Sequence, residues 1–522
     1  MKYLEIEAKV KHVYQELNPA CKQAFWISFA LINLAFLFHT VNFMFGDHDW
    51  NYVRSANYWS EGSFEGRPLH FVLQSLLFDG HVLPILNNLF SFAAMALSGI
   101  LLAHYWRIPL TVFNYTVFST FVGVLPFTMV WLFYAKDTLI NLSLPLIVIS
   151  GLLIAQNHTK ISHIIAIALF YFALSSYAAV MDMIGICFLG KVLVQYLEQK
   201  SIKNIFKNVW PIILDIALAL VLFKFTLAVI DIKADYNTKT LAMTDWPQKF
   251  AETLVVMFSQ FITPIPFMEP KYKYMLLALC LYGLGMTLKK SGIFGAPMIV
   301  LIVLVILFVS KFAYFIADER GQILAEMENF AFVPRLDFYG LAYIYALGLA
   351  LALSHTKDKY YKVVATLAVV LTFMSMVRDA YATKVWKLGF DAEMKAHERI
   401  VGRMEQHKDF RLGQKYRLLQ VGSLSLRQNY YREVNNEQIS LDLLSTSFTP
   451  QYMSRIVYNF YYPKDIFYNN ATIEDLSNRG REYLVYRAKS WPAQESIFID
   501  GDIIIVVLTD EDLEQAQKKL TH

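Results

Sequence analysis

Apolar and polar positions divide the chain into a long part typical of membrane proteins and a shorter polar part. From about residue 25 to residue 390, apolar runs alternate with polar segments. A helix needs about 20 apolar residues to cross a bilayer, and each run is close to that length. The runs predict eleven spanning helices, which begin near Phe25, Val82, Leu110, Thr138, Ile161, Met183, Val209, Tyr274, Ile293, Leu336 and Tyr361.

Three polar segments between the runs are long: 46–81, 231–273 and 317–335. Two of them contain apolar residues at helical spacing. The first such stripe follows Pro68 and consists of Leu69, Val72, Leu73, Leu76 and Leu77. The second consists of Phe250, Leu254, Met257, Phe258 and Phe261. Both are too short to span, so we expect helices that lie in the membrane interface. The alternative is that they pack on the helix bundle.

The composition changes from Asp391 onward, where charged residues become common and no run reaches spanning length. The pattern predicts strands over 416–421, 483–487 and 497–507, and helices over 392–406, 436–444 and 511–520. The expected fold is therefore mainly α. A polytopic membrane domain over 1–390 is followed by a soluble α/β domain over 391–522.

The balance of residue types supports a bilayer as the solvent for much of the chain. Hydrophobic residues make up 56% of the sequence and charged residues 17%, and the mean hydropathy is +0.38. A soluble protein this apolar could not cover its surface with polar groups. The net charge of +4 comes without a basic stripe, so nucleic acid is not an expected partner.

Lysine and arginine predict the orientation, because they are enriched in short cytoplasmic loops. With a cytoplasmic N-terminus, six inner segments carry most of these residues, among them Arg107, Lys160 and the pair Lys289–Lys290. An odd number of spans then places residues 391–522 outside. The expected location is a bacterial inner membrane, with multiple passes and a periplasmic C-terminal domain.

The segment 46–54, Gly-Asp-His-Asp-Trp-Asn-Tyr-Val-Arg, has the greatest density of reactive side chains. It could be an ordinary solvated loop. However, it follows the first span directly, and charge at a membrane boundary is costly unless it is used. A carboxylate such as Asp49 can accept the proton of an attacking hydroxyl. An arginine such as Arg54 can stabilise a departing phosphate.

The order of these features resembles the bacterial type II glucosyl transferase (Gtr) family, membrane enzymes of the glycosyltransferase-C type. In that family an Asp-Asp-Trp-x-x-Arg-like segment follows the first span, and a Gly-Arg pair precedes the second. Here the resemblance is carried by Asp49-Trp50 with Arg54, Gly66-Arg67, Ser176-Tyr177 and Pro334-Arg335. It covers about residues 45–355 and departs where His48 separates Asp47 from Asp49.

The resemblance implies an inverting membrane glycosyltransferase (hexosyltransferase). The donor would be a polyprenyl-phosphate-linked sugar, and the acceptor a periplasmic glycan such as the O-antigen of lipopolysaccharide. We expect Asp49 to be the general base, with Asp47 as the alternative. No cofactor is certain, although such a carboxylate could bind a divalent cation. The candidate substrate-binding residues are Arg54, Arg67, Arg335, His48, Lys136, Tyr177 and Trp50.

A few other polar residues lie within the apolar runs. Asp182 follows Ser176-Tyr177 and could line the same cavity. Asp215 and Lys224 are nine residues apart, about half a turn out of phase on a helix, so they need different partners. His158 and His163 lie on the predicted cytoplasmic side and receive no role.

Two other functions remain open. A polymerase or ligase of lipid-linked glycans would usually carry one large outer loop late in the chain, whereas here the first loop is richest in charge. A lipid-glycan transporter or flippase would show internal repeats and interrupted spans, and the sequence has no convincing repeat. The pattern names neither the sugar nor the acceptor, the linkage, the oligomeric state or the role of residues 391–522.

Overall fold

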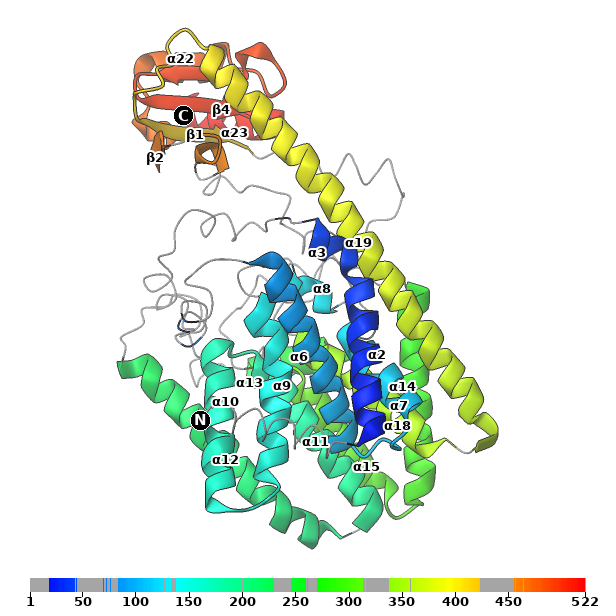
Figure 1. Ribbon diagram of the computed structural model, residues 1–522. Helices are drawn as coiled ribbons and strands as arrows, with labels where there is room; N and C mark the ends of the chain where they lie inside the picture. The colour runs from blue at the N-terminus through cyan, green and yellow to red at the C-terminus, as the bar shows by residue number, and fades with distance from the viewer. Residues whose placement is uncertain are drawn as a thin grey trace, which may run out of the picture. The chain divides into compact units, whose positions relative to one another are not determined.

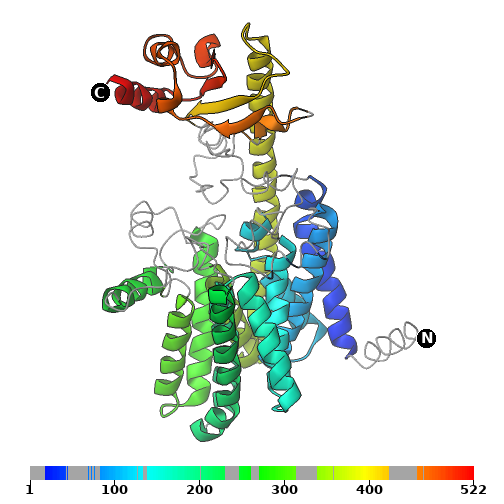
Figure 2. The same ribbon diagram turned by 90° about the vertical axis from the view of Figure 1, so that its left-hand side faces the viewer.

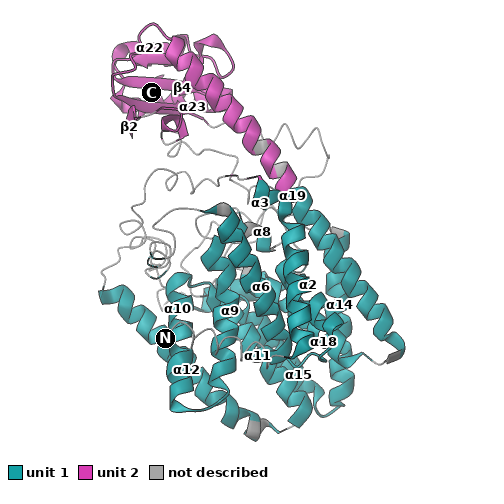
Figure 3. Ribbon diagram, viewed as in Figure 1, with its two compact units in different colours: residues 1–41, 56–132, 137–382 teal, residues 42–55, 133–136, 383–522 magenta. Residues whose placement is uncertain are grey.

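The structure is a computed structural model that divides into two compact units (Figure 3). Unit 1 consists of residues 1–41, 56–132 and 137–382, and unit 2 of residues 42–55, 133–136 and 383–522. The residues that the structure describes are 18–42, 44, 69, 72, 76, 83–125, 127–132, 138–199, 201–229, 246–259, 261, 270–312, 315, 338–356, 358–422, 455, 457–462 and 464–521.

Unit 1 is a bundle of helices that run alongside one another (Figures 1 and 2). Its described helices are α2 (Pro19–Ala35), α3 (Leu37–Val41), α6 (Pro84–Tyr105), α7 (Val112–Gly123), α8 (Phe127–Leu132), α9 (Thr138–Ala155), α10 (Lys160–Ser176), α11 (Val180–Gln199), α12 (Ile202–Val229), α13 (Trp246–Ser259), α14 (Pro270–Ser291), α15 (Ala296–Val309), α18 (Phe338–His355) and the first part of α19 (Asp358–Gln406).

Short polar residues start several of these helices. The Asn18 side chain accepts a hydrogen bond from the Ala20 N–H ahead of α2. Thr159 and Ser162 exchange hydrogen bonds as a capping box at the start of α10. Because such caps satisfy backbone N–H groups that have no partner inside the helix, α2 and α10 begin at defined residues.

Small residues let the helices of unit 1 pack closely. A Cβ atom on Gly348 of α18 would lie 2.2 Å from the Cys280 Sγ of α14. A Cβ atom on Gly99 of α6 would lie 2.6 Å from the Ser119 Cα of α7. Such contacts at glycine are typical of helix association in membranes, where van der Waals packing replaces the hydrophobic effect.

All eleven predicted runs contain helix. A helix must also be long and apolar enough to cross the membrane. Within the described residues, five helices are long and apolar enough to cross a bilayer: α6, α9, α11, α12 and α19. Others are short, such as α7 with 12 residues and α15 with 14. Exposed apolar side chains on α12, including Val221, Phe225 and Val229, indicate a membrane protein. The number eleven stays a prediction.

The two amphipathic stripes have different outcomes. In the first, Leu69, Val72 and Leu76 are helical, and the residues between them lie outside the described part. The second stripe falls on α13, whose buried face is Lys249, Thr253, Val256 and Met257. The predicted face was therefore partly wrong, because Phe250 and Phe258 are about half exposed. Phe250 contacts Phe308 of α15 at a ring distance of 5.5 Å, so α13 packs on the bundle.

Unit 2 contains a four-stranded sheet in the order β2-β1-β4-β3. The strands are β1 (Tyr416–Val421), β2 (Phe467–Asn470), β3 (Ile497–Asp500) and β4 (Ile503–Val507). Strand β1 is central and pairs in parallel with both β2 and β4. β3 and β4 form an antiparallel hairpin, and Gly501 in its turn has a φ of +63°, which favours glycine.

Both faces of this sheet are covered, because alternate residues of a strand point to opposite sides. On one face Leu418, Ile504 and Val506 pack with Ile400 and Met404 of α19. On the other face Leu419, Ile505 and Val507 pack against α22 (Asn478–Tyr486) and α23 (Asp510–Thr521). The α/β architecture predicted for the C-terminal region is thus present, with its apolar strands buried between helices (Figure 2).

The detailed predictions for this region had mixed outcomes. The strand over 416–421 and the helix over 511–520 are confirmed by β1 and α23, and 392–406 belongs to α19. The range 497–507 contains two strands rather than one. The strand predicted over 483–487 is wrong, because Ser477 caps a helix there by accepting from the Gly480 N–H. The helix predicted over 436–444 lies outside the described residues, and the domain limit at 390 stays a prediction.

Candidate functional site

Most of the predicted site residues lie outside the described part of the chain. These are Asp47, His48, Asp49, Trp50, Arg54, Arg67, Lys136 and Arg335. The remaining candidate, Tyr177, is described and lies between α10 and α11. Its N–H donates to the Ala173 carbonyl at 3.0 Å, and its carbonyl accepts from the Val180 N–H at 3.1 Å. Tyr177 thus closes one helix and leads into the next.

The Tyr177 ring belongs to a cluster of three aromatic side chains. Its centroid is 5.1 Å from that of Trp131 on α8 and 6.1 Å from that of Tyr339 on α18. Trp131 and Tyr339 stack at 5.1 Å. All three residues are buried. We call them the aromatic cluster, and they join three helices that are far apart in the sequence.

Hydrogen bonds hold this aromatic cluster to α9. The Tyr339 hydroxyl donates to the Asn141 carbonyl at 2.8 Å. The Thr138 hydroxyl donates to the Trp131 carbonyl at 3.2 Å. The positions of the rings are therefore fixed by polar contacts as well as by packing.

Buried polar residues gather around the aromatic cluster. They lie at the end of unit 1 where α6, α9, α11, α14 and α18 begin, which we call the Tyr177 end. All are less than 9% exposed: Asn87, Asn88, Ser91, Thr138, Asn141, Ser175, Ser176 and Asp182. Polar groups inside a membrane domain are costly, so this group marks the Tyr177 end as a candidate functional region.

Two buried amides in this group stand out. The side chains of Asn87 and Asn141 are each 1% exposed. Neither amide has a hydrogen-bond partner in the part of the chain that the structure describes. A buried amide without a partner costs free energy, so native proteins seldom keep one without a reason.

A buried carboxylate on α19 was missed by the sequence analysis. Asp379 is 0% exposed, and within the described residues neither of its oxygens has a hydrogen-bond partner. One turn earlier, Ser375 shares a hydrogen bond with the hydroxyl of Tyr272 at the start of α14. The only sequence signal was an acidic residue within the last apolar run, which also fits an exposed interface position.

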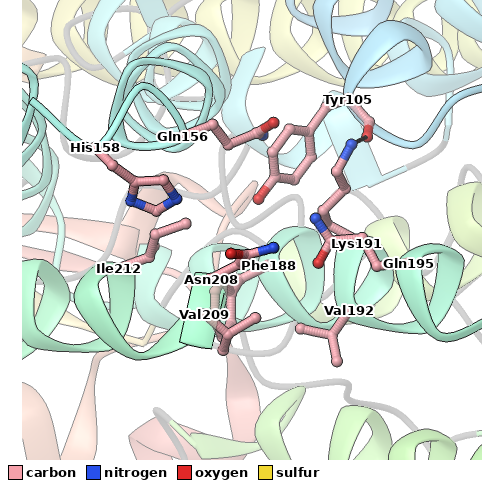
Figure 4. Close-up of a pocket in the computed structure, with 10 residues that line it drawn as sticks. All are labelled: Tyr105, Gln156, His158, Phe188, Lys191, Val192, Gln195, Asn208, Val209 and Ile212. Carbon is pink, nitrogen blue, oxygen red and sulfur yellow. Dashed lines mark hydrogen bonds between the residues drawn. The ribbon is translucent and has the colours of Figure 1, made fainter. Parts of the chain in front are cut away.

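The opposite end of unit 1, where α6, α9 and α11 end, contains a cavity of about 200 Å³ (Figure 4). We call it the Arg107 end. Side chains from α6, α11, α12 and the turn after α9 surround the cavity. Its polar lining residues are Tyr105, Gln156, His158, Lys191, Gln195 and Asn208. Its apolar wall is formed by Phe188, Val192, Val209 and Ile212.

Charged groups near this cavity are arranged in specific pairs. Arg107 forms an ion pair with Glu198 of α11. His163 Nδ1 lies 2.6 Å from the Asp215 Oδ2, so α10 supplies the partner that the sequence could not name. Lys224 is exposed on a different face of α12, in agreement with the expectation of different partners.

The loop for which a divalent cation is predicted lies outside the described residues. Within the described residues, no group of three or more His, Cys, Asp and Glu side chains could hold a metal ion. Asp47 and Asp49 are the carboxylates that could bind the cation, and they are not in that part of the chain. A cation at these residues stays a prediction.

Comparison with known proteins gave one match. A family model described as glucosyl transferase GtrII matches residues 40–377. That range includes the segment 46–54, Tyr177 and Arg335, and it ends before the sheet of unit 2. No curated protein and no solved structure matches the chain.

Proposed function

The chain belongs to the glucosyl transferase GtrII family, and from that premise we propose that it moves a sugar from a polyprenyl-phosphate donor to a glycan. Family membership supports a glycosyltransferase, and the apolar helices support a location in a bilayer. Glucose is the sugar that the family description names. The donor, the acceptor and the catalytic base are parts of the proposal.

The proposed reaction is a single displacement with inversion. A hydroxyl of the acceptor attacks the anomeric carbon of the sugar, and Asp49 takes the hydroxyl proton. The bond between the anomeric carbon and the phosphate oxygen breaks at the same time. The polyprenyl phosphate leaves with the bonding electron pair, and its charge is stabilised by Arg67 and Arg335. Asp47 is the alternative base.

The remaining candidates would bind substrate. Arg54 and Lys136 add positive charge for the donor phosphate. His48, Trp50 and Tyr177 would contact the sugar, because aromatic faces and polar ring atoms suit a carbohydrate. A polyprenyl chain can reach such a site sideways from the bilayer. The reacting sugar alone would then need to contact water.

The observation that supports the proposal is the position of the candidate segments along the chain, each ahead of a helix that begins at the Tyr177 end. The loop 46–81 precedes α6, Lys136 precedes α9, and Arg335 precedes α18. All three helices begin at the Tyr177 end, beside the aromatic cluster and the buried polar residues. Each candidate segment is thus followed along the chain by a helix that begins at the end of unit 1 where Tyr177 lies.

The side of the membrane is also proposed. The lysine and arginine bias favours a periplasmic Tyr177 end in a bacterial inner membrane. Unit 2 would then recognise the acceptor or cover the site. Removal of residues 391–522 should lower transfer to the native glycan, and full transfer by the truncated protein would contradict this role.

The decisive experiment uses the purified full-length protein with a polyprenyl-phosphate glucose donor. Replacement of the true base, by Asp49→Asn or Asp47→Asn, should lower transfer by about 100-fold or more. Asp510→Asn, at the exposed start of α23, is the control and should leave transfer unchanged. If both loop variants stay fully active, the base assignment is wrong. Donor movement across proteoliposomes without transfer would favour a flippase instead.

A further inference from the structure

The cavity at the Arg107 end has the chemistry of an anion site. Its polar lining is rich in donors, with an ammonium, an imidazole, a phenol and three amides. None of the described lining residues is acidic. A volume of about 200 Å³ has room for several waters or for one tetrahedral oxyanion. The proposed transfer reaction at the Tyr177 end leaves this cavity without a role.

Lys191 gives the strongest support for an anion site at this cavity. It is 6% exposed, and its ammonium donates to the Tyr105 carbonyl at 2.8 Å. The same nitrogen lies 5.1 Å from the centroid of the Tyr105 ring. In the described part of the chain it has no carboxylate partner, because nearby Glu198 is paired with Arg107. A buried cation without a counter-charge is rare in native proteins.

Contact with the end of α6 explains only part of this arrangement. A lysine that binds the last carbonyl of a helix stabilises the helix end. That role uses one of the three N–H donors of Lys191. It gives no reason for the buried Nε2 of Gln156 or the buried hydroxyl of Tyr105, two donors that have no hydrogen-bond partner among the described residues. The donors around Lys191 therefore point to a ligand rather than to a helix cap alone.

Two residues that follow helix ends near the cavity have a left-handed backbone conformation. Arg107 and His158 follow the ends of α6 and α9 with φ values of +57° and +50°. Glycine is usual at such left-handed positions, because a side chain there is strained. Of the two, His158 lines the cavity, whereas Arg107 pairs with Glu198. The left-handed backbone at His158 thus places a polar side chain at the cavity.

The outer face of α12 indicates where a phosphate would come from. Phe206 and Trp210 stack at 5.6 Å, and both are exposed beside the lining residues Asn208 and Val209. Exposed aromatic residues at a helix end are typical of the membrane interface. Lys207 between them is exposed as well. Basic pockets between helix ends on the cytoplasmic side suit the phosphates of lipid headgroups.

We propose that the cavity beside Lys191 binds a phosphate group, of the kind carried by an anionic lipid headgroup or by free phosphate. The ammonium of Lys191 would pair with a phosphate oxygen, and Gln195 and Asn208 would donate hydrogen bonds. The site lies at the opposite end of unit 1 from the proposed transfer reaction. Binding there does not depend on which residue is the catalytic base.

The test measures ligand binding to the full-length protein in a detergent that contains no phosphate. One arm titrates dihexanoyl phosphatidic acid, and a second arm titrates inorganic phosphate. Dihexanoyl glycerol, which lacks the phosphate, is the ligand control. We expect phosphatidic acid to bind, and Lys191→Met to raise its dissociation constant by about tenfold or more. Lys289→Met, at an exposed lysine of α14 at the same end, is the protein control.

Gln195→Leu keeps the test decisive if Lys191→Met does not fold. Because Oε1 of Gln195 has no hydrogen-bond partner within the described part of the chain, this variant should fold normally. It should still bind phosphatidic acid more weakly than the parent protein. Inorganic phosphate that binds as tightly, and with the same dependence on Lys191 and Gln195, would identify free phosphate as the source. The proposal is overturned if neither phosphate compound binds, or if both variants bind like the parent.

Discussion

Buried amides behave differently in the two units of this protein. In unit 2, the Asn459 side chain donates to the Phe467 carbonyl at 2.8 Å and accepts from the N–H groups of Ile466 and Phe467. In unit 1, the buried amides of Asn87 and Asn141 have no partner among the described residues. The first arrangement holds a strand in place. The second costs stability, so it indicates a site kept for something other than the fold.

Carboxylates show the same contrast. In unit 2, Asp500 accepts hydrogen bonds from the Ser477 N–H and hydroxyl, and Asp502 pairs with Arg417. In unit 1, Asp379 is completely buried and has no hydrogen bond within the described part of the chain. The carboxylates of Asp500 and Asp502 therefore serve the fold of unit 2. Asp379 has no such partner within the described residues, so we expect a role in sugar transfer.

The largest loss of stability should follow replacement of Asn459, whose buried amide has hydrogen-bond partners. Asn459→Ala leaves the Phe467 carbonyl and two backbone N–H groups without their side-chain partner. We expect a loss of about 3 kcal/mol in the local stability of unit 2, since each buried group left unpaired costs about 1–3 kcal/mol. Hydrogen exchange of a peptide covering 464–470 in the full-length protein measures it. A loss below about 1 kcal/mol would mean that packing alone holds β2.

Replacement of Asp379, which has no hydrogen bond among the described residues, should lower sugar transfer but not stability. Asp379→Asn keeps the shape of the side chain and removes a buried group that can ionise, so unfolding should occur at the same temperature or slightly higher. We expect sugar transfer to fall about tenfold, or about 1.4 kcal/mol in transition-state stabilisation. Asp391→Asn, on the same helix but paired with Lys387 at the surface, is the control. A large loss of stability with unchanged transfer would give Asp379 a structural role.

Removal of the Tyr339 hydroxyl, which holds the aromatic cluster to α9, should lower the stability of unit 1 by a smaller amount. Tyr339→Phe removes the hydrogen bond to the Asn141 carbonyl but leaves the ring in place. We expect unit 1 to lose about 1 kcal/mol, measured by thermal unfolding in detergent. Tyr486→Phe, at a residue that is 81% exposed, should change nothing. Equal unfolding temperatures for the parent protein and Tyr339→Phe would show that the hydroxyl contributes little.

The smallest effect concerns the pH dependence of unit 2. Burial lowers the pKa of His407 from its ordinary value of 6.5. The charge of Asp409 opposes this shift, whereas Lys408 and Arg479 add to it. The neutral ring also accepts a hydrogen bond from the Asp409 N–H at 3.3 Å. The unfolded chain therefore binds more protons just below pH 6.5, and unit 2 should lose stability as the pH falls through that window.

The control for this titration is His407→Gln, which cannot take up a proton. Urea unfolding of unit 2 in the full-length protein should depend on pH between 5 and about 7 in the parent and less in the variant. An identical pH dependence in both proteins would assign it to other groups. Above pH 7 the two proteins should show no difference in slope, because the imidazole is neutral in both states.

Local features of the fold were predictable because they depend on neighbouring residues. Run length and period predicted helix at each apolar run and strand at β1, where Leu418 and Leu419 face opposite sides of the sheet. The strand predicted over 483–487 failed for a local reason as well. The bulky and β-branched residues resemble a strand, but the cap at Ser477 starts a helix.

The site was less predictable because its partners are distant in the sequence. Lys191 binds a carbonyl 86 residues away, and His163 contacts Asp215 across 52 residues. Tyr177 was found from a short motif, but no pattern could join it to Trp131 and Tyr339. Asp47 and Asp49 stay a prediction, since they lie outside the described residues.

The sequence by itself determined that apolar helices form, that an α/β region follows them, and which family the residues resemble. These properties follow from the spacing of apolar side chains and from short motifs, which are local. Only the tertiary structure decided which polar groups are buried, which of them lack a side-chain partner among the described residues, and which end of the bundle contains them. Burial and pairing depend on what the rest of the chain places around a side chain, so Asn141, Lys191 and Asp379 could not be told from ordinary polar residues in sequence alone.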